Sequence, residues 1–196
     1  RTASGTATFA ASSSTGVQRG IENIQLLGTG TTDNSTALAI DLLLDFTGRA
    51  AGTLSFDAAT MFNSTGNRAG TLRVYGTTDG VNFSELTGTD LPFVATNNVA
   101  KSASISGISL PAGFTGSATA RLRFYYHNGT GGSSGSRPKL SIDNIAVTST
   151  PQALAISANP ASISIPPGTS TTLNVTASGV GALSYQWYQG TAPDTS

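Results

Sequence analysis

Apolar and polar residues alternate along most of this chain, and Gly, Asn, Asp and Ser interrupt the alternation at short intervals. The segment Ala120–His127 shows the pattern clearly, with Leu122, Phe124 and Tyr126 at every second position. Successive side chains of a β-strand point to opposite faces of its sheet, so this pattern predicts strands that are buried on one face. Helical periodicity is nearly absent. We therefore expect an all-β, antiparallel fold.

The first 148 residues contain enough strand signals for two packed sheets. The expected strands are Thr6–Ala10, Ile21–Leu27, Ala37–Phe46, Gly52–Phe62, Gly70–Thr77, Phe83–Leu86, Ser102–Leu110, Ser117–His127 and Pro138–Thr148. Many short strands joined by Gly-rich turns are typical of a β-sandwich, and we expect a jelly-roll arrangement. The Asp79-Gly80 pair predicts a tight hairpin, because such a turn needs positive φ angles.

The aromatic residues in this region are expected mainly in the core. Those in apolar alternation are Phe9, Phe46, Phe56, Phe83, Phe114 and Phe124. Burial of each would stabilise the fold by roughly 1.5–3 kcal/mol.

Composition points to an exported protein and excludes several classes of function. Charged residues make up 10% of the chain, and the formal net charge is zero, so no positive field exists to hold nucleic acid. The chain has no cysteine, which excludes disulfides and thiolate zinc sites and suits a bacterial exported protein. No apolar run approaches the ~20 residues that cross a membrane. We expect a secreted or cell-surface bacterial protein without membrane insertion.

The motifs of common enzymes are absent from the sequence. His127 is the one histidine, and there is no HExxH, phosphate-loop or GxGxxG motif. The two glutamates, Glu22 and Glu85, and the scattered aspartates do not suggest a converging carboxylate pair. We expect no catalytic residues and no enzyme activity.

Two of the expected strands carry large polar and aromatic residues on the face opposite their apolar residues. Arg73 and Tyr75 alternate with Leu and Val, and Arg123, Tyr125 and His127 alternate with Leu, Phe and Tyr. If the two strands lie in one sheet, these five residues form one surface, where flat rings can stack on sugars and guanidiniums can donate to hydroxyls. An ordinary solvated outer face is the alternative interpretation.

Two segments of the first region resemble bacterial extracellular jelly-roll modules of the carbohydrate-binding type. They are Val74–Phe83, with the sequence VYGTTDGVNF, and Ile142–Ile145, with the sequence IDNI. The resemblance extends over residues 1–148 by pattern. It implies a non-catalytic module that binds a polysaccharide or other glycan.

The same resemblance implies a structural calcium ion at the closing strand. In several such families an aspartate at this point ligates calcium near the N-terminal strand, and here Asp143 and Asn144 match the motif. Glu22, Asp33 and Asp41 are the candidates for the acidic partner. The alternative is that Asp143 bonds backbone amides at a strand bulge.

The C-terminal region has a different pattern, which is similar to bacterial immunoglobulin-like repeats. Spaced Gly168, Leu173, Val175, Ala177 and Gly179 are followed by LSYQWY at positions 183–188. Trp187 matches the buried tryptophan of that family. Strands are expected at Ala153–Ala158, Ser162–Ile165, Thr171–Ala177 and Leu183–Tyr188. The resemblance implies the first half of an immunoglobulin-like sandwich over residues 153–196, joined to the jelly-roll-like domain 1–148 by a linker at 149–152.

Half a sandwich leaves an apolar face and strand edges open, so we expect self-association through residues 153–196 by β-strand addition. Three hypotheses for function stay open at this point. The first is a non-catalytic binding module directed at carbohydrate. The second is a structural subunit of a surface filament, adhesin stalk or surface layer, and the third is a spacer of an exported hydrolase.

Overall fold

The computed structural model describes residues 16–28, 36–61, 66–96, 99–128, 132–135, 137–179 and 183–190. The chain divides into two compact units, Arg1–Thr150 and Pro151–Ser196. Residues 149–151 of the expected linker continue the last strand of the first unit. The described residues include no helix long and apolar enough to span a membrane.

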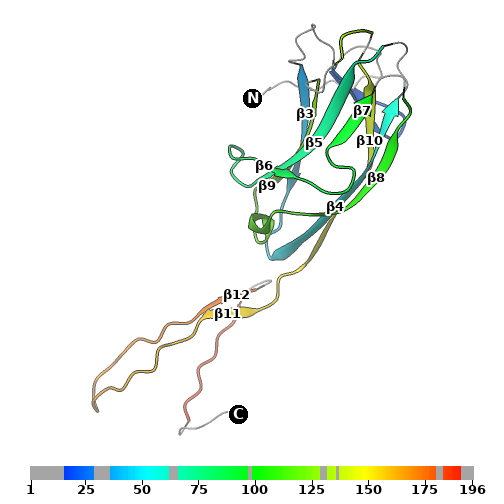
Figure 1. The fold of residues 1–196 in the computed structure, drawn as a ribbon. Helices are drawn as coiled ribbons and strands as arrows, with labels where there is room; N and C mark the ends of the chain where they lie inside the picture. The colour runs from blue at the N-terminus through cyan, green and yellow to red at the C-terminus, as the bar shows by residue number, and fades with distance from the viewer. Residues whose placement is uncertain are drawn as a thin grey trace. The chain divides into compact units, whose positions relative to one another are not determined.

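The first unit is an antiparallel β-sandwich, which confirms the expected fold class (Figure 1). One sheet, called sheet I, has the order β1 (Gly16–Arg19), β2 (Ile24–Leu27), β10 (Lys139–Pro151), β4 (Arg49–Met61) and β8 (Ser102–Ser109). The other, called sheet II, has the order β3 (Ala37–Leu44), β9 (Ala120–His127), β5 (Ala69–Thr77) and β6 (Ser84–Leu86), and β7 (Phe93–Thr96) also pairs with β5. A short 3-10 helix, η1, spans Ala112–Phe114.

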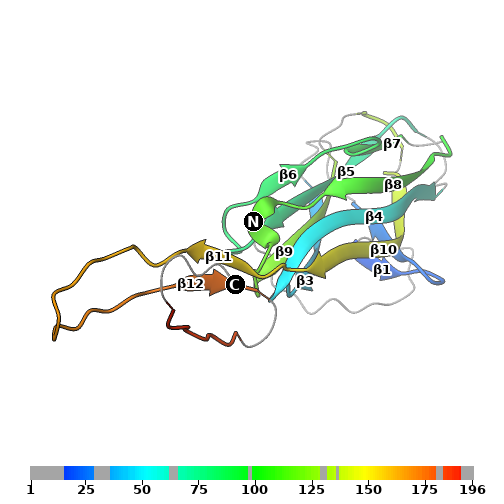
Figure 2. The same ribbon diagram turned by 90° about the horizontal axis from the view of Figure 1, so that it is seen from below.

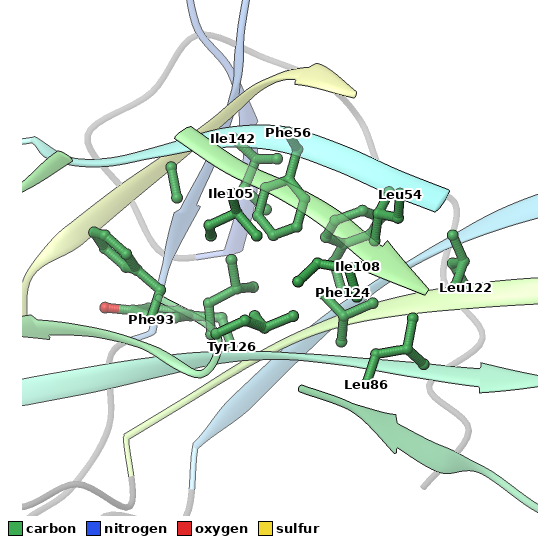
Figure 3. Close-up of a cluster of buried hydrophobic side chains, with 14 of the residues drawn as sticks. Leu54, Phe56, Leu86, Phe93, Ile105, Ile108, Leu122, Phe124, Tyr126 and Ile142 are labelled. Atoms are coloured by element: carbon green, nitrogen blue, oxygen red, sulfur yellow. The ribbon is translucent and has the colours of Figure 1, made fainter. Parts of the chain in front are cut away.

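The core lies between the two sheets and is continuous across them (Figures 2 and 3). Phe56 of sheet I meets Phe124 of sheet II edge to face, with ring centroids 5.2 Å apart. Tyr126 is fully buried, and its hydroxyl donates to the Pro138 carbonyl oxygen at 2.8 Å. Gly70 lies so close to the Tyr126 ring that no larger side chain fits there. The alternation of residues in sheet II is therefore fixed by tightly packed inward side chains.

Four of the expected core aromatics are buried: Phe46, Phe56, Phe114 and Phe124. The expectation for Phe83 is wrong, because it precedes β6 and its ring lies under the Arg123 guanidinium on the outer face of sheet II. Phe9 lies outside the described residues.

The structure also corrects the expected hairpin at Asp79-Gly80. Strands β5 and β6 begin their pairing at Gly76 and Ser84, so the connection is longer than a two-residue turn. The Asp79 carboxylate orders this loop by accepting backbone N–H groups of Val81 and Asn82, each at 2.8 Å. These bonds hold the pKa of Asp79 well below its usual range.

The described residues of the second unit form one antiparallel pair, β11 (Ala155–Ala158) with β12 (Thr176–Ser178). The strands expected at 162–165 and 183–188 are not strands in the structure. The expected burial of Trp187 is also wrong, since the residue is 58% exposed. Within the part of this unit that the structure describes, a single two-stranded ladder has no opposing sheet to cover its apolar residues.

Candidate binding face of sheet II

The structure places all five sequence-predicted binding residues on the outer face of sheet II. Strands β5 and β9 are neighbours, and their register sets Arg73 opposite Tyr125 and Tyr75 opposite Arg123. His127 lies one row further along β9, opposite Thr71. The five side chains therefore form two adjacent columns. Their use in binding stays a prediction.

These side chains face outward because the residues between them face the core. On β5 the inward residues are Leu72 and Val74, and on β9 they are Leu122, Phe124 and Tyr126. A slip of one residue in either strand would turn the buried residues out and the polar ones in, at a large cost in buried apolar area.

The rings on this face contact one another across and along the strands. The Tyr75 and Tyr125 rings meet edge to face, with centroids 6.1 Å apart and an interplanar angle of 79°. The Tyr125 and His127 rings lie 5.6 Å apart and are more nearly parallel, at 32°. All three residues are half-buried. Burial, together with the nearby Glu85 carboxylate, raises the pKa of the Tyr75 hydroxyl, so this group is neutral at neutral pH.

Arg123 is anchored by Asp41 of β3 and by the Phe83 ring, which precedes β6. Its Nε and Nη2 donate to the two carboxylate oxygens of Asp41 on β3, both at 2.7 Å. The Phe83 ring lies 4.3 Å from its guanidinium carbon. Arg121 donates to the same Asp41 at 3.2 Å. The hydrogen bond from Arg123 lowers the pKa of Asp41 and raises that of Arg123, so both stay ionised.

Arg73 links the aromatic column to β6. Its Nη1 donates to Glu85 Oε1 at 2.6 Å, and its Nε donates to His127 Nε2 at 3.2 Å. Because His127 Nε2 accepts this bond, its ring proton lies on Nδ1. Burial, and then the Arg73 charge, lower the pKa of His127 from its ordinary value of 6.5. The imidazole is therefore neutral at pH 7.

Three residues of this face were not predicted as part of it: Asp41, Glu85 and Phe83. The sequence predicts Asp41 as a candidate calcium partner and Phe83 as a core residue. Pairing register decides their positions, since Asp41 lies opposite Arg123 and Glu85 opposite Tyr75. The sequence carries one usable signal, which is the alternation of Asp41 and Glu85 with inward-facing leucines.

The face thus combines flat rings with guanidinium donors that are already fixed in position. Asp41 accepts two of the five N–H donors of Arg123. The charges largely offset each other, since Arg73, Arg121 and Arg123 lie beside Asp41 and Glu85. Such a surface suits contact with an uncharged ligand that has both apolar C–H faces and hydroxyl groups.

Asp143 and Asn144 lie at the middle of β10, where the strand changes phase. Leu140 and Ile142 are buried before this point, and Ile145 and Val147 pack against the core after it. Asn144 has a φ of 50°, and its backbone N–H donates to Asp143 Oδ1 at 2.7 Å. A one-residue change of phase with a positive φ is typical of a β-bulge.

Among the described residues, the surroundings of Asp143 hold one of the three candidate acidic partners for calcium. Glu22 and Asp143 line a common hollow, but the Asn144 side-chain amide donates to Asp57 at 2.7 Å. Asp41 is bound to Arg123, and Asp33 lies outside the described residues. In the part of the chain that the structure describes, no three His, Cys, Asp or Glu side chains group to hold a metal ion. Calcium at Asp143 and Asn144 stays a prediction.

No protein-family model and no curated protein sequence matches this chain. Among solved structures, the chain is similar to one titled "Crystal structure of Caldicellulosiruptor saccharolyticus CBM27-1 in complex with mannohexaose", with a TM-score of 0.39 and 15% identity. The match covers 63% of this chain and 72% of that chain. A likeness this distant carries no argument about function.

Proposed function

We propose that the outer face of sheet II binds carbohydrate, and that this chain is a non-catalytic binding part of a secreted or cell-surface bacterial protein. The observation that carries the proposal is the pair of columns on β5 and β9. They bring Tyr75, Tyr125 and His127 into ring contact beside two anchored arginines.

Each part of the face supplies one element of sugar recognition. Tyrosine rings offer apolar faces at a low cost in side-chain entropy, since each has two rotatable side-chain angles. Arg73 and Arg123 are held by Glu85 and Asp41, so little further ordering is needed when a hydroxyl accepts from them. The near balance of charge favours a neutral sugar over a strongly acidic one.

The test is a glycan array probed with the full chain, followed by calorimetric titration of the sugars retained. The Tyr75→Ala, Tyr125→Ala double variant is compared with Ser104→Ala, which alters a hydroxyl on the outer face of sheet I. The proposal expects one class of neutral oligosaccharide to bind the wild type and the Ser104 variant but not the double variant. Binding that is equal in all three would contradict it.

A second candidate function rests on the second unit. Its exposed large apolar residues are Leu154, Ile156, Ile163, Ile165, Leu173, Tyr185, Trp187 and Tyr188. Leu154, Ile156, Leu183 and Trp187 also line a common hollow. An apolar surface of this extent favours a contact with another chain, as in a structural subunit of a filament, adhesin stalk or surface layer. Polymers that the wild type forms and the Trp187→Ser variant does not form, with the fold of sheet II unchanged, would favour this candidate.

A further inference from the structure

The four sheet edges formed by the described strands differ in how they are protected against pairing with another chain. Natural sheets protect their edges with very short strands, bulges, prolines or charges. Three of the four edges follow this rule. Strand β1 has 4 residues, while β6 and β7, which share one edge of β5, have 3 and 4. Strand β8 has 8 residues but contains a register shift beside Gly107, where φ is 67°.

Strand β3 is the exception. It has 8 residues, all of them in unbroken register with β9, and the sequence ALAIDLLL contains no Gly or Pro and one charged residue, Asp41. No strand among the described residues pairs with its other side. A long, regular and apolar edge is a template for β-strand addition.

The side chains of β3 also leave apolar surface uncovered at this edge. Leu38, Ile40, Leu42 and Leu44 face the sandwich interior but are only partly buried, unlike the inward residues of β5 and β9. Leu43 points outward and is 68% exposed. A strand added beside β3 would cover the half-buried leucines and satisfy the backbone groups of the edge together.

We propose that this edge pairs antiparallel with β3 of a second copy of this chain, with Ile40 opposite Ile40. Residues opposite each other in an antiparallel pair point to the same face. This register sets Leu38 opposite Leu42, so the inward residues meet inward residues across the joint. The two copies of sheet II become one continuous sheet, and residues 37–43 of each copy pair over about 24 Å at roughly 3.4 Å per residue.

The charges of the chain support a second copy as the occupant. The formal net charge is zero, so two copies do not repel at long range. Asp41 is the one charged residue of β3, and Arg123 and Arg121 offset its charge. In the Ile40-centred register, Asp41 faces Ala39 of the other copy, which keeps the two Asp41 carboxylates from lying opposite each other. This inference concerns an edge of the sheet and does not depend on glycan binding.

A charge substitution at Ala39 tests both the joint and its register. Ala39 is exposed on the outer face, so either charge should be tolerated in one folded chain. The Ala39→Lys ammonium would lie opposite Asp41 of the second copy, and the Ala39→Glu carboxylate would lie opposite the same group. Because each contact occurs twice per dimer, we expect the Glu variant to dimerise about tenfold more weakly than the Lys variant in low salt. Ser106→Lys and Ser106→Glu, on β8, are the matched controls.

The readout is the mass in solution of the full chain over a range of concentrations, by sedimentation equilibrium. The inference expects a dimer of twice 19.8 kDa. The Ala39→Lys variant should dimerise more tightly than the Ala39→Glu variant. The Ser106→Lys and Ser106→Glu variants should dimerise equally. Equal dimerisation of the two Ala39 variants would overturn it, as would a monomer at every concentration. A monomer whose β3 amides resist hydrogen exchange would show that another segment of the same chain covers the edge.

Discussion

The two outer faces of the sandwich carry residues of very different size. On the outer face of sheet I, over β4, β8 and β10, most side chains are small and several bond to one another, with Arg49 at the start of β4 as a large exception. Asp57 accepts from Ser104 at 2.6 Å and from Asn144 at 2.7 Å, and the Thr53 and Thr148 hydroxyls lie 3.0 Å apart. The described residues of these three strands place no aromatic ring outward. On sheet II, the corresponding positions of β5 and β9 hold tyrosine, histidine and arginine.

Both faces cover the same core, so the difference teaches what the fold requires. The small side chains of sheet I meet the needs of an outward-facing strand, which are to alternate with the core residues and to satisfy polar groups. The large rings and anchored arginines of sheet II exceed those needs. We interpret that excess as the signature of a binding surface.

The largest effect is expected from removing the rings of sheet II. The Tyr75→Ala, Tyr125→Ala double variant should bind a glycan ligand at least about tenfold more weakly, which corresponds to about 1.4 kcal/mol, because the flat contact area is lost. Titration calorimetry measures the change, and circular dichroism checks that the fold is retained. An unchanged glycan affinity in a folded variant would show that the rings of sheet II do not contribute to binding.

A smaller effect is expected from loosening one arginine. Arg123→Lys removes the two-pronged hydrogen bond to Asp41, and the side chain of Arg123 is only 15% exposed. We expect the free energy of unfolding to fall by about 1–2 kcal/mol, and glycan affinity to fall with it. Arg49→Lys is the matched control, since Arg49 is exposed and bonds Ser149 where β4 begins and β10 ends in sheet I. Equal losses in the two variants would show that Arg123 has no special anchoring role.

The ring of His127 gives sheet II a dependence on pH. Its pKa lies below the ordinary value of 6.5 in the folded chain, so the unfolded chain takes up the proton first as the pH falls. The stability that depends on neutral His127 is fully present above pH 6.5 and is lost as the pH falls through the folded pKa. We expect the melting temperature to fall less between about pH 7.5 and 5.5 in His127→Gln than in the wild type. Identical profiles of melting temperature against pH in the two proteins would show that His127 does not cause the pH dependence.

The smallest effect is expected on sheet I. Asp57→Asn should leave glycan affinity unchanged, because the residue lies on the opposite face. The variant should lower the melting temperature slightly in neutral buffer, since hydrogen bonds from Asn144 and Ser104 lower the pKa of Asp57 and keep it ionised. A loss of glycan binding in this variant would indicate that the ligand binds sheet I and would contradict the proposed site on sheet II.

The sequence predicted much of sheet II because alternation reports directly on which residues share a face. The columns Arg73–Tyr75 and Arg123–His127 follow from period two alone. Their partners could not be predicted, since Asp41 and Glu85 meet the arginines only through the pairing register of β3, β9, β5 and β6. Register depends on contacts between distant parts of the chain.

The missed and mistaken elements have physical reasons of their own. Strand β7, with the sequence FVAT, is short and follows Pro92, so local signals favour a loop. Phe83 sits in an apolar-looking run, but it precedes β6 and finds its partner in the Arg123 guanidinium. In the second unit, the expected strands at 162–165 and 183–188 lack partners among the described residues, and strand propensity without a partner is weak.

The most direct test of the central claim is a nuclear magnetic resonance titration of the full chain with the oligosaccharide that an array selects. The account predicts shifts concentrated on the outward residues of β5 and β9, around Tyr75, Tyr125 and His127, with the amides of β4 and β8 unmoved. Shifts confined to sheet I or to residues 151–196, or no shift at millimolar sugar, would contradict it.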